Sequence, residues 1–222
     1  MGSEVRVKVE YEVEVRDRHG RLIERREGES RSLLRNFIAA LRAMMAGTPD
    51  PSALQLHSCG AEDKAIDVDG NEKTIYGGYI CSANNPKGMG WVMAVNAPDD
   101  DDSYGIVVGK SSLAVAPDNY NLDDKIPHGT DVGQLDYGPH MFEEKAVEGN
   151  VSYFRFSRTF TNLSGQSITV QEIGIIAWNY WRDNGGVRND VKFLILRDVL
   201  DSPVSVPDGA TLTVRYKFKV AA

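Results

Sequence analysis

The segment His57-Ser58-Cys59 places an imidazole two residues from a thiol, the two residue types that form a Cys–His nucleophile pair. Such a pair needs the imidazole to point at the thiol, whereas residues two apart on a strand share a face without facing each other. We therefore interpret Cys59, and Cys81 with it, as free buried thiols. The sequence has no Cys-x-x-Cys or His-Glu-x-x-His spacing, so a zinc site is not expected.

Calcium is the one cofactor that the sequence indicates. Asp99, Asp100, Asp101 and Asp102 are consecutive and offer the hard oxygen ligands that calcium prefers. Adjacent carboxylates also repel one another, and such a run is typical of a solvated loop. Residues 67–72 resemble half of a calcium-binding loop, but the glycine comes too early and the distal glutamate is missing, so we interpret them as a β-turn.

Other catalytic patterns are missing. Gly109-Lys110-Ser111 imitates the end of a phosphate-binding loop, but the glycine that the motif needs is replaced by Tyr104. No Gly-x-Ser-x-Gly nucleophile elbow occurs. Glu172, Asp183 and Asp190 could supply a glycosidase pair, but nothing in their spacing pairs them. We predict that the chain is not an enzyme.

Aromatic residues gather near residue 180. Trp178, Tyr180, Trp181 and Arg182 lie where a predicted strand runs into a glycine-rich loop. Core packing is one interpretation, an interface hot spot is a second, because Trp, Tyr and Arg dominate such sites, and sugar stacking is a third.

Period-two alternation predicts most of the elements that position these residues. Residues 4–16 alternate valine or tyrosine with charged residues, which predicts a strand with one solvated face. Asp17–Gly20 predicts a turn, and a return strand over 21–27 completes an antiparallel hairpin. Further strands are predicted over 105–109, 151–161, 167–178, 192–197 and 211–220.

One helix is predicted after the hairpin. Ser30 or Ser32 is the expected N-cap, and Gly47 is the expected residue just past its end. Apolar residues at helical spacing predict a face that covers the sheet, and Met44 and Met45 at its end are candidates for contact with a partner subunit. This face comprises Leu33, Leu34, Phe37, Ile38, Leu41, Met44 and Met45.

Turn clusters join the strands, which predicts a single mainly β domain over residues 1–222, an antiparallel sandwich or jelly-roll-like fold with one amphipathic helix. Residues 1–48 form the hairpin and helix, 49–104 a loop-rich excursion, and 105–222 the main strand-rich core. The excursion carries too few apolar residues for a core of its own.

Composition excludes several classes. The 25 Lys and Arg against 32 Asp and Glu give a net charge of -7, which disfavours direct nucleic-acid binding. Two cysteines cannot form a disulfide framework. No apolar run is long enough for membrane insertion, and the first residues lack the apolar region of a signal peptide.

Several segments resemble a loosely defined group of uncharacterised phage and virus-like virion proteins, with the N-terminal hairpin and 30–37 similar to the start of that group and residues 50–100 unmatched. The matching segments are 105–109, 120–122, 126–129, 134–137, 158–162, 164–165, 170–174, 197–199 and 203–207. The resemblance implies a β-sandwich virion structural protein that is made in the host cytoplasm, forms homo-oligomers and contacts other virion proteins.

From the residues and the resemblance together we expect a non-enzymatic phage or virus structural protein that self-assembles into a capsid, decoration layer, tail or tube. The alternative is a carbohydrate- or receptor-binding β-sandwich module that uses the loop at Trp178–Trp181 and calcium at Asp99–Asp102.

Overall fold

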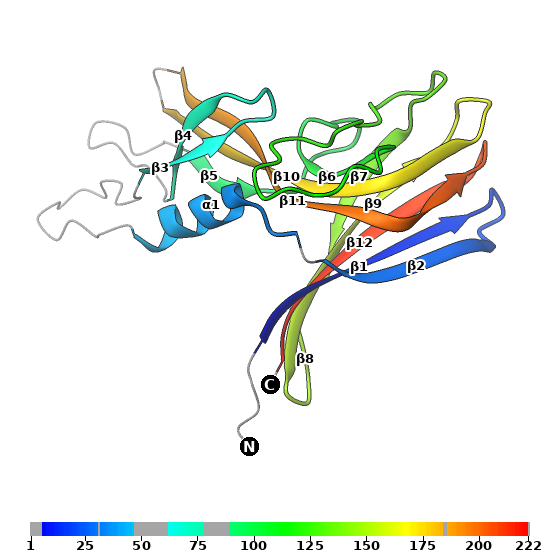
Figure 1. The fold of residues 1–222 in the computed structure, drawn as a ribbon, viewed down its shortest axis with the longest axis horizontal. Coiled ribbons are helices and arrows are strands. Elements are labelled where there is room, and N and C mark those ends of the chain that lie inside the picture. The colour runs from blue at the N-terminus through cyan, green and yellow to red at the C-terminus, as the bar shows by residue number, and fades with distance from the viewer. Residues whose placement is uncertain (1–5, 31, 47–61, 78–88, 184–185, 222) are drawn as a thin grey trace, which may run out of the picture.

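A computed structural model of the chain describes residues 6–30, 32–46, 62–77, 89–183 and 186–221 (Figure 1). The fold is mainly β, with antiparallel sheets and, in these residues, one helix that follows an N-terminal hairpin. This confirms the predicted fold class. No helix in the described part of the chain is long and apolar enough to cross a membrane.

The larger sheet, called the large sheet below, has the order β2-β1-β12-β9-β7, with the short β8 also paired to β9. The bounds of its longest strands, β1, β9 and β12, agree with the predicted ranges to within two residues. Its members are β1 (Arg6–Arg16), β2 (Leu22–Ser30), β7 (Asp136–Phe142), β8 (Ala146–Glu148), β9 (Val151–Thr161) and β12 (Thr211–Ala221).

A second sheet, the small sheet, has the order β11-β10-β5, and β6 pairs with another stretch of β10. Its strands are β5 (Met89–Ala94), β6 (Gly105–Gly109), β10 (Ile168–Asp183) and β11 (Gly186–Val206). β10 and β11 are longer than predicted, because β10 continues past Trp178 to pair with β5. Residues 89–94 of the predicted excursion are therefore a strand of the small sheet.

The two sheets share one hydrophobic core. The large sheet contributes alternate residues such as Val13, Phe160 and Val214, as expected for a sheet with one solvated face. β6 is buried along its whole length. A strand covered on both faces has a continuous apolar sequence, which is why Gly105–Gly109 does not alternate.

The helix differs from its prediction. α1 spans Arg35–Met45, its N-cap is Leu34 without a side-chain hydrogen bond, and Ser30 belongs to β2. Ser32 is not a cap either, because its hydroxyl donates to Asp198 Oδ1 at 3.1 Å. Gly47 lies outside the described residues. The predicted cap was therefore wrong for both serines: Ser30 ends a strand, and the hydroxyl of Ser32 bonds to Asp198 on β11 instead of to the first turn of the helix.

The buried side of α1 is only partly the predicted one, since Leu34 at the N-cap is buried and Phe37 packs against the core. Asn36, Ala40 and Ala43 are buried, whereas Ile38 and Met45 are 58% and 77% exposed. Small residues face inward because the helix lies against the hairpin of β3 (Glu62–Ile66) and β4 (Glu72–Tyr76). A Cβ at Gly77 would stand 1.8 Å from the carbonyl oxygen of Ala43, so the backbones approach too closely for bulkier residues. Asn36 fixes the contact by hydrogen bonding to both backbone groups of Ile66.

A buried ion pair anchors the long loop between β6 and β7 to the small sheet. Arg197 Nε donates to Glu172 Oε2 at 2.8 Å, and both side chains are almost wholly buried. Glu172 also accepts hydrogen bonds from the backbone amides of Asp123 and Asp124 in the loop. Arg197 therefore pairs with Glu172 rather than with the neighbouring Asp198, which lies on the opposite face of β11 and contacts Ser32.

Candidate functional site

The inner face of the large sheet continues beyond the part that the small sheet covers. In Figure 1 the end of the sheet that holds β8, the start of β1 and the end of β12 extends away from the second layer. Alternate side chains of this end lie on the core-facing side of the sheet. Val7 and Val220 are paired across β1 and β12, and Phe154 and Phe218 are paired across β9 and β12, in the same register as the buried residues of these strands. We call Val7, Phe142, Val147, Phe154, Phe218 and Val220 the uncovered apolar face.

Exposure of these residues is high for large apolar side chains. Val7 is 72% exposed, Val147 66%, Phe142 46%, Val220 43% and Phe154 39%. Phe156, on the same strand face as Phe154, is only 2% exposed, so the transition from core to solvent occurs within one strand. Exposed apolar patches on protein surfaces are common contact surfaces, so these residues are candidates for one.

Two pairs of aromatic rings stack on the uncovered apolar face or at its border with the core. The rings of Phe154 and Phe218 are 5.2 Å apart and inclined by only 6°, and those of Phe142 and Phe156 are 4.8 Å apart and inclined by 4°. Rings held in this way lose little conformational entropy when a partner covers them.

The opposite face of the same strands is polar and carries ion pairs. Glu10 pairs with Lys219, Glu12 pairs with Arg215, and Lys217 Nζ lies 3.9 Å from the centre of the Tyr153 ring. This polar face can remain in water, whereas removing the apolar face from water lowers the free energy. The two faces therefore have different expected environments.

The edge strand β2 does not offer a comparable surface. In the described residues β2 is paired on one side only, by β1. The strand is rich in charged residues, which include an Arg26–Glu24 ion pair and an Arg25–Glu27 pair at 2.5 Å. Charged edge strands resist pairing with another chain, so the face of the large sheet is the better contact surface.

The predicted aromatic interface residues are only partly described. Trp178 is half-buried between Tyr104 and Tyr180, with ring centres 5.0 and 4.6 Å away, and its Nε1–H donates to Asp190 Oδ1 at 2.6 Å. Trp181 and Arg182 belong to β10, but their side chains lie outside the described ones. Trp178 packs against the core, and its role at an interface stays a prediction.

The exposed side of α1 carries the other predicted interface residues. Met44 is 38% and Met45 77% exposed, beside Ile38 and Leu41. The next residues along the chain, and with them Cys59 and Cys81, lie outside the described residues.

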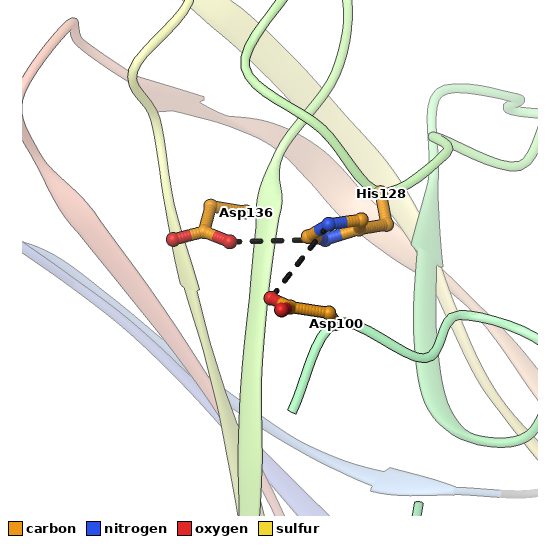
Figure 2. A group of neighbouring side chains, drawn as sticks. All are labelled: Asp100, His128 and Asp136. Carbon is orange, nitrogen blue, oxygen red and sulfur yellow. Dashed lines mark ion pairs between the residues drawn. The ribbon is translucent and has the colours of Figure 1, made fainter. Parts of the chain in front are cut away.

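The four consecutive aspartates do not converge on one point. Asp99 is exposed, Asp101 Oδ1 accepts hydrogen bonds from the backbone and hydroxyl of Ser103, and Asp102 Oδ2 accepts one from the His128 amide. Asp100 alone faces other potential ligands, His128 and Asp136 (Figure 2).

A buried arginine that the sequence did not single out organises the loop holding these aspartates. Arg158 on β9 is fully buried, and all its N–H-bearing nitrogens donate to backbone carbonyl oxygens. Nε donates to Gly138, and the two terminal nitrogens donate to Tyr104, Ile106, Pro98 and Asp101. Its position in an alternating strand among apolar residues was the available signal, because an inward-facing arginine must be hydrogen-bonded.

His140 closes the same loop in its neutral form. Its Nε2 accepts a hydrogen bond from the Ile106 amide at 2.8 Å, and Nδ1 lies 3.0 Å from the Ala97 carbonyl oxygen, to which it donates. Burial lowers the pKa of His140 from 6.5 to about 4. Gly105 permits this approach, because a Cβ there would meet the ring at 2.3 Å.

We expect His140 to make the protein less stable in acid. The folded pKa of about 4 is below the ordinary 6.5, so the unfolded chain binds the proton first, and stability present above 6.5 falls as the pH drops towards 4. The loss from this residue is on the order of 3 kcal/mol. Urea unfolding at a series of pH values should show a flatter dependence for His140→Gln than for the parent. His19→Gln, an exposed control, should keep the parental slope, and identical slopes in all three proteins would contradict the assignment.

Comparison of the chain with protein-family models, curated proteins and solved structures found no match.

Proposed function

We propose that the chain is a structural subunit of a phage or virus particle that assembles with copies of itself through the uncovered apolar face. The observation that carries this proposal is the continuation of the core-facing side of the large sheet into solvent, with Val7 and Val147 as its most exposed members. The resemblance of several segments to virion proteins supports the same class.

A second copy is the partner that fits this face best. Sheets pack face to face when both surfaces are apolar and share a similar twist, and a copy of the chain meets both conditions. A two-fold arrangement would place the stacked pair Phe154 and Phe218 of one subunit against the same surface of another. The charged outer face and the charged edge at β2 would remain in solvent. The product would be one component of a capsid, decoration layer, tail or tube.

The test uses two exposed apolar residues on opposite faces of the same sheet edge. Val147 is 66% exposed on the apolar side, and Met141 is 69% exposed on the outer side, because it pairs with Ser157 rather than with the core-facing Phe156. We expect the parent protein and Met141→Lys to form closed multimers by light scattering and negative-stain electron microscopy. Val147→Lys combined with Val220→Lys should give monomers near 24.5 kDa. The free energy needed to bury an unpaired charge exceeds the free energy that the apolar contact contributes to association.

Either of two results would overturn the proposal. One is a parent protein that stays monomeric over the accessible concentration range. The other is a double variant that assembles like the parent, which would move the interface to another surface.

A second candidate is a glycan- or receptor-binding module, and a polar cleft favours it. The cleft, of about 430 Å³, lies between the β3–β4 hairpin, β11 and the loops before and after β6. Its lining includes polar side chains that could bind sugar hydroxyls, namely Asp102, Asn121, Lys125 and Asp190. Asp190 also accepts a hydrogen bond from the indole N–H of Trp178. Glycan-dependent quenching of tryptophan fluorescence would support this function, and no quenching across a broad glycan panel would exclude it.

A further inference from the structure

Three potential metal ligands from separate segments converge at one edge of the large sheet (Figure 2). Asp100 belongs to the loop between β5 and β6, His128 to the loop between β6 and β7, and Asp136 is the first residue of β7. One ligand atom of each lies within 4.8 Å of the other two. Asp100 Oδ1 is 3.7 Å from His128 Nε2, and Asp136 Oδ1 is 3.7 Å from His128 Nδ1.

Backbone hydrogen bonds hold these segments together before any ion binds. The Asp100 amide donates to the Tyr137 carbonyl oxygen at 2.9 Å, and the Leu135 amide donates to that of Pro127 at 3.2 Å. The His128 amide is held by Asp102. Asp100 has a φ of 64°, the only positive value outside glycine in the described residues. The three side chains therefore start from positions that the surrounding backbone determines.

The charge of this cluster is not balanced by protein groups. In the part of the chain that the structure describes, the carboxylates of Asp100 and Asp136 contact no cationic group or hydrogen-bond donor other than the imidazole of His128. The Tyr137 amide donates to Nδ1 of the imidazole at 3.2 Å, and one imidazole, which carries at most one positive charge, cannot offset two carboxylates. Asp101 and Asp102, by contrast, are bonded to Ser103 and Lys125.

We propose that Asp100, His128 and Asp136 bind a divalent transition-metal ion, of which Zn²⁺ is the representative probe. One imidazole nitrogen and two carboxylate oxygens form a donor set that Zn²⁺ accepts, and the exposure of 70% at Asp100 leaves room for water to complete the coordination. The imidazole gives up the bond from the Tyr137 amide, which at 3.2 Å is long, and gains the attraction of the ion. The bound ion would join the β5–β6 loop, the β6–β7 loop and β7.

Calorimetric titration of the full chain with zinc chloride tests the proposal. We expect one equivalent to bind and the melting temperature to rise with it. Asp100→Asn, His128→Gln and Asp136→Asn should each weaken binding by at least about tenfold and abolish the thermal shift. Asp99→Asn, an exposed neighbour with the same change of charge, should bind as the parent does.

Three results would overturn the proposal. They are the absence of saturable Zn²⁺ binding, unchanged binding in His128→Gln, and an equal loss in Asp99→Asn, which would indicate non-specific attraction to the acidic run. Binding of Ca²⁺ in place of Zn²⁺, lost in Asp101→Asn, would likewise replace this site with one in the aspartate run itself.

Discussion

Arg158→Met should destabilise the protein by about 5 kcal/mol, the largest effect expected from any single substitution considered. The change removes the donor of five backbone carbonyl oxygens, of which those of Tyr104 and Ile106 are buried. Burial already lowers the pKa of Arg158, yet no carboxylate in the described residues pairs with it. Its stabilising role is therefore hydrogen bonding to backbone, with the Tyr137 ring 4.8 Å away as a further contact.

Arg155→Met is the matched control for this substitution. Arg155 lies on the same strand but on its outer face, half-exposed and paired with Glu143 at 2.6 Å. An exposed ion pair contributes up to about 1 kcal/mol, so little stability should be lost. Urea unfolding at one fixed protein concentration compares the variants, because assembly would couple stability to concentration. Equal losses in Arg158→Met and Arg155→Met would refute the role assigned to Arg158.

Arg197→Met should cost about 4 kcal/mol, because it leaves the buried carboxylate of Glu172 without its cation. The amides of Asp123 and Asp124 still bond to that carboxylate but do not neutralise it. In Arg197→Met combined with Glu172→Gln no buried charge remains, and the glutamine oxygen can still accept from the loop. We therefore expect the double variant to recover roughly half of the loss.

The measurement for this second prediction is a double-mutant cycle of unfolding free energies, with hydrogen exchange at Asp123 and Asp124 as the local readout. Exchange there should be fastest in the single variant Arg197→Met, where the loop loses its anchor. Strictly additive free energies would show that Glu172 and Arg197 contribute independently, contrary to the contact at 2.8 Å.

Strand positions were predictable where one face is buried and the other solvated. Residues 151–161 and 211–220 alternate, and the structure has β9 and β12 there, because the same period of two governs both burial and register. The burial of Asn36, Ala40 and Ala43 on α1 was not predictable, since it depends on a close approach to Gly77 that only small residues allow. The pattern of apolar residues indicates which side chains favour burial, but it does not indicate which element will pack against them or how closely.

For the candidate sites too, the sequence indicated the residue types but not which residues lie together in the fold. The acidic run at Asp99–Asp102 was visible as a source of ligands, but spacing could not show that Asp100 alone turns towards His128 and Asp136. The uncovered apolar face was equally hidden. Val7 and Val220 fit the alternation of their strands perfectly, and only the shorter extent of the small sheet leaves them exposed.

The central place of β12 in the large sheet has a consequence for synthesis. The strand emerges last from the ribosome among those described, yet it lies between β1 and β9, which are made much earlier. Until it arrives, the large sheet is two separate parts, β2-β1 on one side and β9 with its neighbours on the other. Such long-range closure is slow, and it makes formation of the large sheet depend on β12. Phe218 and Val220 on this strand also complete the uncovered apolar face, so a nascent or truncated subunit would lack part of the surface that we propose for assembly.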